Sequence, residues 1–245
     1  MKHIPGAEVI DALTATAERD GKASLPALTQ ADLCALGVAG KALLCQDTWD
    51  WWLSLGERGR EKTAANSLSL LAFRELLMPA RGQVPAVPVP ELGLILAARS
   101  APEPLAICNL PGQDAGSNPR FFGMTQRGTG LRVLVCELLT DKPTSPGDRA
   151  GFGNEITYAL VTPWYAATML STWARIASAC ADAEWPTIDI YAHNPGGQLV
   201  LDRHELLLDG DLFYARRPAI PQSAQRLDEM MVTQLLTAAL TEAVR

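Results

Sequence analysis

The segment DRHELLLDGDLFYARRP (residues 202–218) carries the densest group of side chains in this sequence that could do chemistry. Carboxylates and imidazoles at such close spacing serve as metal ligands or as general acids and bases. If the segment is a strand, residues 202 and 204 share one face and residues 203 and 205 the other, because side chains alternate. The members of the group are Asp202, His204, Glu205, Asp209 and Asp211.

A metal site in this segment would need further ligands, because zinc is held by three or four converging side chains. Asp202 and His204 supply two of them, and His193 or Asp189 on a neighbouring strand could join. A metal- or His/Asp-dependent enzyme built around Asp202, His204 and His193 is therefore one hypothesis for the function.

The same segment is also typical of an ordinary β-hairpin. Asp209–Gly210 between two apolar runs predicts a primed turn, whose backbone requires positive φ, and this turn accounts for both Asp209 and Asp211. Elsewhere the sequence has no GxSxG elbow, no Walker loop and no HExxH helix. These observations favour a binding protein that uses no cofactor and no metal over an enzyme.

Composition restricts the class of protein. The 245 residues are 48% hydrophobic and 20% charged, which is the balance of a soluble globular protein, and the formal net charge is −6. An acidic chain without a run of Lys or Arg is not expected to bind nucleic acid. No stretch reaches the roughly 18 apolar residues of a membrane span, so we expect no membrane insertion.

The cysteines indicate a reducing compartment. The chain has 5 of them, and no two form a CxxC pair, which argues against a disulfide framework and against a zinc ribbon. Cys34, Cys108 and Cys136 lie in apolar runs, so we expect them to be small buried side chains. We therefore predict a cytoplasmic protein.

The hydrophobic pattern changes along the chain. Residues 1–107 have mainly helical spacing, and Thr29 with Asp32 predicts the start of a helix over 28–44. Residues 108–245 show a strand-like pattern, with three strands and a helix occurring twice. The expected segments are 120–128, 131–139, 155–163 and 164–183, then 187–194, 199–208, 212–218 and 223–244. We predict an α+β fold: an antiparallel β-sheet built from two quasi-repeated βββα units, with a helical N-terminal region, in one compact domain.

A binding protein needs an interface, and aromatic and Arg side chains dominate binding energy at interfaces. Such side chains gather in the first strand of each predicted unit and in the last strand of the second unit. Strand alternation requires that some of them be buried. The candidate partner-binding residues are Phe121, Phe122, Met124, Tyr191, Phe213, Tyr214, Arg216 and Arg217.

The run AANSLSLLAFRELL, followed by VPVPELGLILAARSAPEPLAI, resembles the EspG family of actinobacterial type VII secretion chaperones. The resemblance covers residues 61–107 in motif and 120–244 in the order of elements. The chain departs from the family pattern at Glu75, where a glycine is expected after Arg74. The resemblance implies a cytosolic chaperone that binds the tip of a helical secreted pair through its sheet and C-terminal helices.

A third hypothesis is a regulator or a structural assembly component. The segment LTQADLCALG, with TAANSLSLLAFRELL after it, has the spacing of a diverged winged helix. The acidic balance of the chain counts against DNA binding by such a region.

Overall fold

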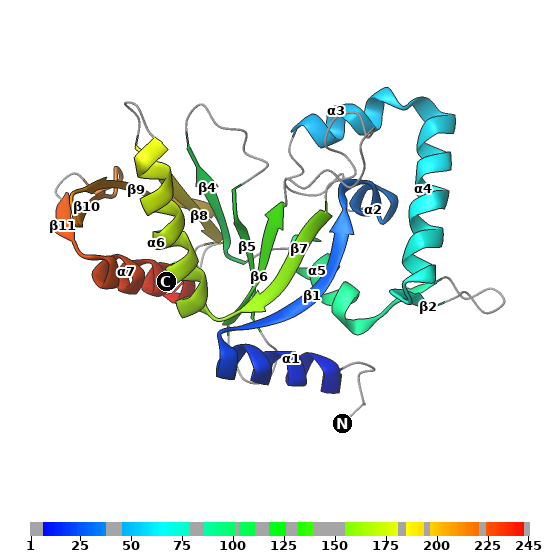
Figure 1. Cartoon of the computed structure of the whole chain (residues 1–245), viewed down its shortest axis with the longest axis horizontal. Coiled ribbons are helices and arrows are strands. Elements are labelled where there is room, and N and C mark those ends of the chain that lie inside the picture. Colours follow the sequence, from blue (N-terminus) through cyan, green and yellow to red (C-terminus); the bar gives the residue numbers. More distant parts are fainter. Residues whose placement is uncertain are drawn as a thin grey trace.

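The fold is α+β, with helices packed on an antiparallel nine-stranded sheet (Figure 1). The computed structural model describes residues 7–37, 46–78, 86–100, 103–110, 118–125, 132–139, 155–180, 185–193, 197–220 and 224–242. Neighbouring strands of the sheet are antiparallel throughout. The predicted fold class is therefore confirmed.

The strands of the large sheet are β1 (Lys22–Thr29), β4 (Leu105–Asn109), β5 (Arg120–Thr125), β6 (Arg132–Leu139), β7 (Glu155–Val161), β8 (Thr187–His193), β9 (Leu199–Asp209), β10 (Leu212–Arg216) and β11 (Gln225–Leu227). Their spatial order is β1-β7-β6-β5-β4-β8-β9-β10-β11. A separate two-stranded sheet pairs β2 (Leu77–Met78) with β3 (Val87–Pro88).

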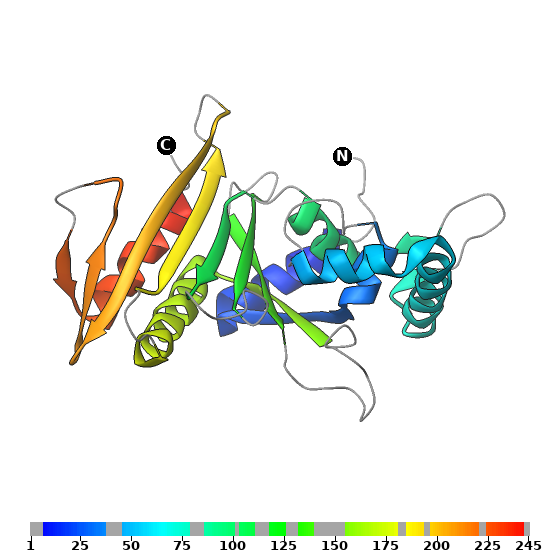
Figure 2. The same cartoon turned by 90° about the horizontal axis from the view of Figure 1, so that it is seen from above.

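The helices are α1 (Ala7–Asp20), α2 (Gln30–Ala35), α3 (Gln46–Ser54), α4 (Gly56–Phe73), α5 (Pro90–Ser100), α6 (Pro163–Cys180) and α7 (Glu229–Glu242). They cover the two faces of the sheet to different extents. On one face, α6 and α7 pack on each other and form a core around Leu170 and Leu236. The strands in this core are, in spatial order, β7, β6, β5, β4, β8, β9 and β10. On the opposite face, α1, α2 and α5 form a second core with β1, β7, β6, β5 and β4, around Leu33 and Ile95. Seen from above, α7 lies along one end of the sheet and the N-terminal helices lie toward the other (Figure 2).

The predicted helical region 1–107 also contains strands that the sequence pattern did not indicate: β1, β2 and β3 lie within it, and β4 begins in it. Strand β1 forms one edge of the sheet and pairs with β7. Its register shifts between Leu25 and Leu28, next to Pro26. Proline cannot donate a ladder hydrogen bond, so an edge strand with an irregularity is where it is tolerated. Because Pro26 interrupts the segment, alternation alone did not predict the strand.

The predicted helix start at Thr29 is confirmed. The Thr29 Oγ1 accepts a hydrogen bond from the Asp32 backbone N–H at 3.1 Å, and the Asp32 Oδ2 accepts one from the Thr29 N–H at 2.9 Å. This reciprocal capping box satisfies two backbone donors at the start of α2. Helix α2 ends at Ala35, and residues 38–44 of the predicted helix lie outside the described residues.

The first predicted βββα unit is present as the consecutive elements β5-β6-β7-α6. The second is β8-β9-β10-β11-α7, because β11 occupies the start of the predicted helix 223–244, and a repeat is not confirmed. The units extend in opposite directions from β4, which separates them. Because β5 and β8 are both antiparallel to β4, they run in the same direction, and both helices lie on the same face. Apart from β11, these relations make one unit a topological mirror image of the other, and no rotation superimposes mirror images.

A buried polar cluster fixes α5 to the sheet. The guanidinium of Arg99 on α5 forms an ion pair with the Glu137 carboxylate on β6, and both side chains are almost fully buried. The Tyr158 hydroxyl donates a hydrogen bond to Glu137 at 2.8 Å, and Arg120 Nη1 lies 3.7 Å from the same carboxylate. Arg99 also lies over the Phe122 ring, 5.1 Å from its centroid. Burial raises the pKa of Tyr158 to about 12, against the opposing effect of the two arginines, so its hydroxyl stays a donor.

We expect Glu137→Gln to lower the free energy of unfolding by about 3–5 kcal/mol, because it leaves the Arg99 charge buried without a counter-charge. Glu205→Gln is the control, since its partner Arg216 is half exposed and such pairs contribute about 0–1 kcal/mol. Urea unfolding of both variants measures the difference. Equal losses in the free energy of unfolding would show that the buried pair contributes no more to stability than the exposed pair.

The Asp209–Gly210 hairpin predicted from the sequence is present. Asp209 pairs with Leu212 across the turn, and Gly210 has φ +65°. A Cβ added at Gly210 would meet nothing within 4 Å, so its backbone conformation is the only obstacle to a side chain there.

We expect Gly210→Val to destabilise the fold by about 1–3 kcal/mol, since a β-branched residue is strained at positive φ. Gly93→Ala is a control, because this helical glycine also has open space around its Cβ position and no positive φ. Thermal melting should show a lower Tm for the first variant alone. An unchanged Tm for Gly210→Val would contradict the strain argument.

Candidate interaction face

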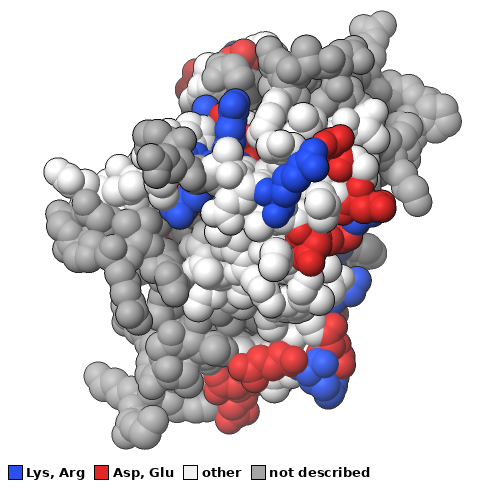
Figure 3. Space-filling view, turned by 90° about the vertical axis from the view of Figure 1, so that its left-hand side faces the viewer, with Lys and Arg blue, Asp and Glu red and all other residues white. Residues whose placement is uncertain are grey.

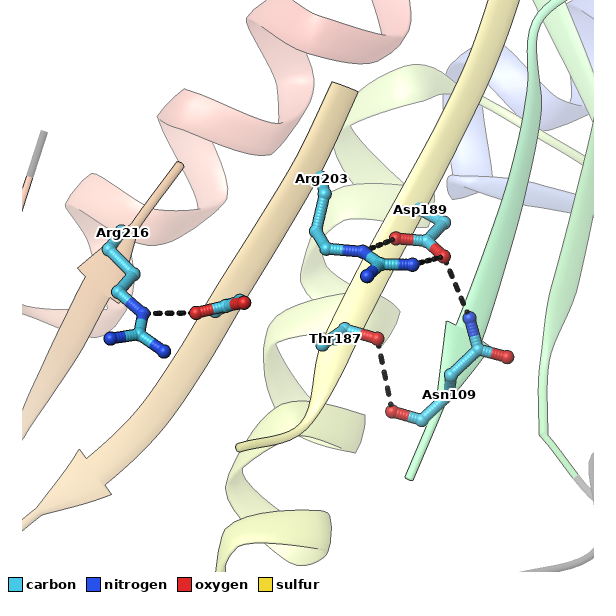
Figure 4. A network of polar contacts seen from close by, with 6 residues as sticks. Asn109, Thr187, Asp189, Arg203 and Arg216 are labelled. Carbon is cyan, nitrogen blue, oxygen red and sulfur yellow. Dashed lines mark hydrogen bonds and ion pairs between the residues drawn. The ribbon is translucent and has the colours of Figure 1, made fainter. Parts of the chain in front are cut away.

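Among the residues that the structure describes, strands β8 to β11 are covered by helices on one side of the sheet and not on the other. The helical core of α1, α2 and α5 reaches as far as β4, and of β8 to β11 only Tyr191 packs at its margin. In Figure 4, α6 and α7 lie behind the strands, and a polar network projects from the opposite side. We name this side of β8–β11 the open face. Register places on it Asp189, Tyr191, Leu199, Leu201, Arg203, Glu205, Leu207, Asp209, Leu212, Tyr214, Arg216 and Arg226.

Ion pairs cross from strand to strand on the open face. Arg203 on β9 donates two hydrogen bonds to the Asp189 carboxylate on β8, at 2.7 and 2.8 Å, and these bonds raise the pKa of Arg203. Asn109 on β4 donates a third to the same carboxylate, at 3.1 Å (Figure 4). Arg216 on β10 forms an ion pair with Glu205 on β9, in which its Nε donates one hydrogen bond to the carboxylate. The carboxylate of Asp189 is only 2% exposed, so Arg203 and Asn109 replace its lost hydration.

Aromatic rings and guanidinium groups are stacked at the β10 side of the open face. The Arg216 guanidinium lies 4.4 Å from the centroid of the Trp185 ring, and that of Arg226 lies 4.9 Å from the Tyr214 ring. The Trp185 and Tyr214 rings meet edge to face at 6.3 Å. Cation–π contacts of this kind hold long side chains in place, so a partner finds them already ordered.

The open face also exposes apolar side chains. Leu201 and Leu212 are 39% and 38% exposed, and Tyr214 is 37% exposed. Seen from the β10–β11 end of the molecule, acidic and basic side chains are interspersed with uncharged surface (Figure 3). Apolar, aromatic and Arg side chains with both signs of charge are typical of protein interfaces, whereas nucleic-acid binding uses a concentrated basic surface.

Only part of the predicted interface lies on this face. Tyr214 and Arg216 lie on it, and Tyr191 lies half-buried at its margin against the N-terminal core. The prediction missed Trp185 and Arg226, which form the stack with these residues. Alternation along β9 is enough to separate Arg203 and Glu205 from Asp202 and His204. The contacts of Trp185 with Arg216 and of Arg226 with Tyr214 join distant segments, so they could not be predicted from the sequence.

The other predicted interface residues lie off the open face, and the prediction is wrong for the three phenylalanines among them. Phe121, Phe122 and Phe213 are fully buried in the two cores, so their side chains are not accessible to a partner. Met124 packs half-buried against the N-terminal core, and Arg217 points to the opposite side of the sheet. Phe121 and Phe122 point to opposite faces of β5, and both are buried because each face is covered by a core at that strand. Phe213 points to the helix-covered face of β10.

Asp202 and His204 lie on the helix-covered face of β9. Arg217 donates two hydrogen bonds to the Asp202 carboxylate, at 2.9 and 2.8 Å, and His204 Nε2 lies 3.1 Å from Asp202 Oδ2. His193 and Asp189 are on the opposite face, where His193 Nδ1 contacts Glu103 at 2.6 Å. His193 and Asp189 therefore cannot join Asp202 and His204 around one ion. Within the described ranges, no three His, Cys, Asp or Glu side chains are placed to hold a metal.

The predicted burial of three cysteines is confirmed. Cys34, Cys108 and Cys136 are buried. Burial raises the pKa of Cys136 to about 12 and that of Cys108 well above its ordinary value. Both thiols are thus protonated at neutral pH, which does not favour them as nucleophiles.

The region proposed from the sequence as a diverged winged helix contains α2, α3 and α4, followed by the two-residue strands β2 and β3. The second half of α4, however, exposes Leu68, Leu70 and Phe73. These apolar side chains offer no phosphate contacts, so the second half of α4 adds no support for DNA binding.

Comparison with protein-family models, with curated proteins and with solved structures finds no match for this chain. Among the residues that the structure describes, no helix combines the length and the apolar character needed to cross a membrane. The function is therefore inferred from the geometry of the sheet.

We expect Asp202→Asn to lower the free energy of unfolding at pH 7 by about 1–3 kcal/mol, through weaker bonding to Arg217. Burial raises the pKa of Asp202, but the bonds from His204 and Arg217 outweigh it and the net pKa is lowered. A lowered carboxyl pKa stabilises the fold above the unfolded value of about 3.9, and this contribution is lost as pH falls through the folded value.

The difference between wild type and Asp202→Asn should therefore be constant from pH 7 to about 5 and shrink below about pH 4. Denaturant unfolding across this pH range measures it. Asp209→Asn is the matched control, because the Asp209–Arg226 pair is exposed and should contribute about 1 kcal/mol or less. A difference that grows on acidification would contradict the assignment.

Proposed function

We propose that this protein is a non-enzymatic chaperone or adaptor that holds a helical protein partner on its open face. The observation that carries the proposal is the uneven cover of one side of the sheet. Over β1, β7, β6, β5 and β4 this side is packed with helices, whereas over β8–β11 the described residues leave it bare. A partner helix laid on β8–β11 would extend the chain's own helical layer.

The chemistry of the open face suits an amphipathic helix. Leu201, Leu212 and Tyr214 supply apolar contact for the inner stripe of such a helix. The ion pairs around them are already neutralised within this chain, so a partner need not bring a large charge of one sign. Stacked Tyr and Arg side chains are of the types that dominate interface energy.

The resemblance of residues 61–107 to the EspG family supports a more specific version of this proposal. In that version the protein acts in the cytoplasm and its partner is a helical pair of proteins destined for type VII secretion. The partner would be held before export through the sheet, and no nucleic acid or membrane is required for binding.

Leu201→Asp tests the interface, because it places a charge on the open face where an apolar stripe would pack. We expect affinity for the partner to fall by at least about 30-fold, equivalent to about 2 kcal/mol. Leu68→Asp on α4 is the matched control, because Leu68 is equally exposed at 39% and lies outside the open face.

The measurement is affinity purification of the tagged chain from its native host, with mass spectrometry and stoichiometry of each complex. The proposal expects a helical partner in defined stoichiometry with wild type and with Leu68→Asp, and its loss with Leu201→Asp. Recovery of the chain alone, or loss of the partner with Leu68→Asp instead, would overturn it.

A further inference from the structure

A cavity of about 260 Å³ lies between β9, β10, β11 and α7, on the side of the sheet opposite the open face. Most of its wall is apolar, with Leu206 from β9, Leu227 from β11 and Leu235 from α7. Ala215 on β10 also lines it, and its small side chain leaves room there. Cavities with apolar walls and a few placed polar groups are typical of small-molecule sites.

Four polar residues line this wall, namely His204, Arg216, Arg217 and Gln225, and His204 is the deeply buried one among them. The imidazole ring of His204 lines the cavity and is 1% exposed to solvent. Its Nε2 contacts Asp202, and its Nδ1 has no hydrogen-bond partner among the described residues. Buried polar atoms are rarely left unpaired, because loss of hydration then goes uncompensated.

The neighbours of His204 determine which nitrogen is free. An ionised carboxylate only accepts hydrogen bonds, and Arg217 keeps Asp202 paired through two donors. The Nε2 of His204 must therefore carry the hydrogen that faces Asp202, and in the neutral ring Nδ1 presents a lone pair. The triad of Arg217, Asp202 and His204 orients one hydrogen-bond acceptor beside an apolar cavity.

We propose that this cavity binds a ring-sized, mainly apolar molecule with a single hydroxyl or N–H group, such as a phenol, whose donor bonds to Nδ1 of His204. The volume suits such a molecule, since an apolar cavity of about 150 Å³ accommodates benzene. His204, Leu206 and Ala215 line this site on the face of β9 and β10 opposite the open face, and Arg216 of the open face also borders it. Binding of the small molecule is measured without the protein partner. Its failure or success therefore leaves the open-face proposal unaffected.

The test compares p-cresol with toluene on the full chain, because the two probes have the same ring and methyl group and differ only in the hydroxyl. Calorimetric titration should show that p-cresol binds about two- to ten-fold more tightly, the ratio expected for one net hydrogen bond. The ¹⁵N resonance of His204 Nδ1 should move with p-cresol and stay in place with toluene.

Two variants assign the binding to this cavity. His204→Phe keeps a ring but removes the acceptor, so p-cresol and toluene should bind with equal affinity. Leu235→Trp fills the cavity and should abolish binding of both, and it serves alone if His204→Phe does not fold. Absence of binding by both probes to wild type, equal affinities, or a His204 Nδ1 resonance that p-cresol leaves unmoved would each overturn the proposal.

Discussion

Both faces of a wide β-sheet must be covered by apolar packing or made compatible with water, and this constraint organises the molecule. Helices α6 and α7 cover one face of the sheet from β7 across to β10 in spatial order. The other face has helical cover from β1 to β4, where Arg99 of α5 is paired with Glu137 of β6 inside the core. From β8 to β11 the described residues provide no such cover, and cross-strand ion pairs take the place of apolar packing.

Arginine side chains keep carboxylates paired on both sides of β9. On the open face Arg203 holds Asp189, and on the helix-covered face Arg217 holds Asp202. Each carboxylate has two hydrogen bonds from a guanidinium, which favours a structural role over metal binding or proton transfer. The segment 202–218, which the sequence singled out for possible chemistry, thus supplies mainly structural ion pairs. Its open side is suited to contact with a partner, and its helix-covered side orients one imidazole beside a cavity.

Features that depend on near neighbours were predictable from the sequence. The Asp209–Gly210 turn needs positive φ at its glycine, and the capping box of Thr29 and Asp32 needs only the right residues three apart. Alternation along β9 likewise separates Asp202 from Arg203 without any knowledge of the rest of the chain. Strand β1 was missed because a strand interrupted by Pro26 is stabilised by pairing with β7, far away in the sequence.

The sequence by itself determined the α+β class, the position of most strands and helices, and the division of each strand into two faces. It did not determine which face is covered, because alternation is symmetric until something packs on one side. Phe213 and Tyr214 illustrate this point: they are neighbours of similar size, yet one is fully buried and the other is 37% exposed. Their difference arises from α6 and α7 on one side of the sheet and from an N-terminal helical layer that ends at β4 on the other. Only the tertiary structure brings these distant segments together, so only it decided where the candidate interaction face lies.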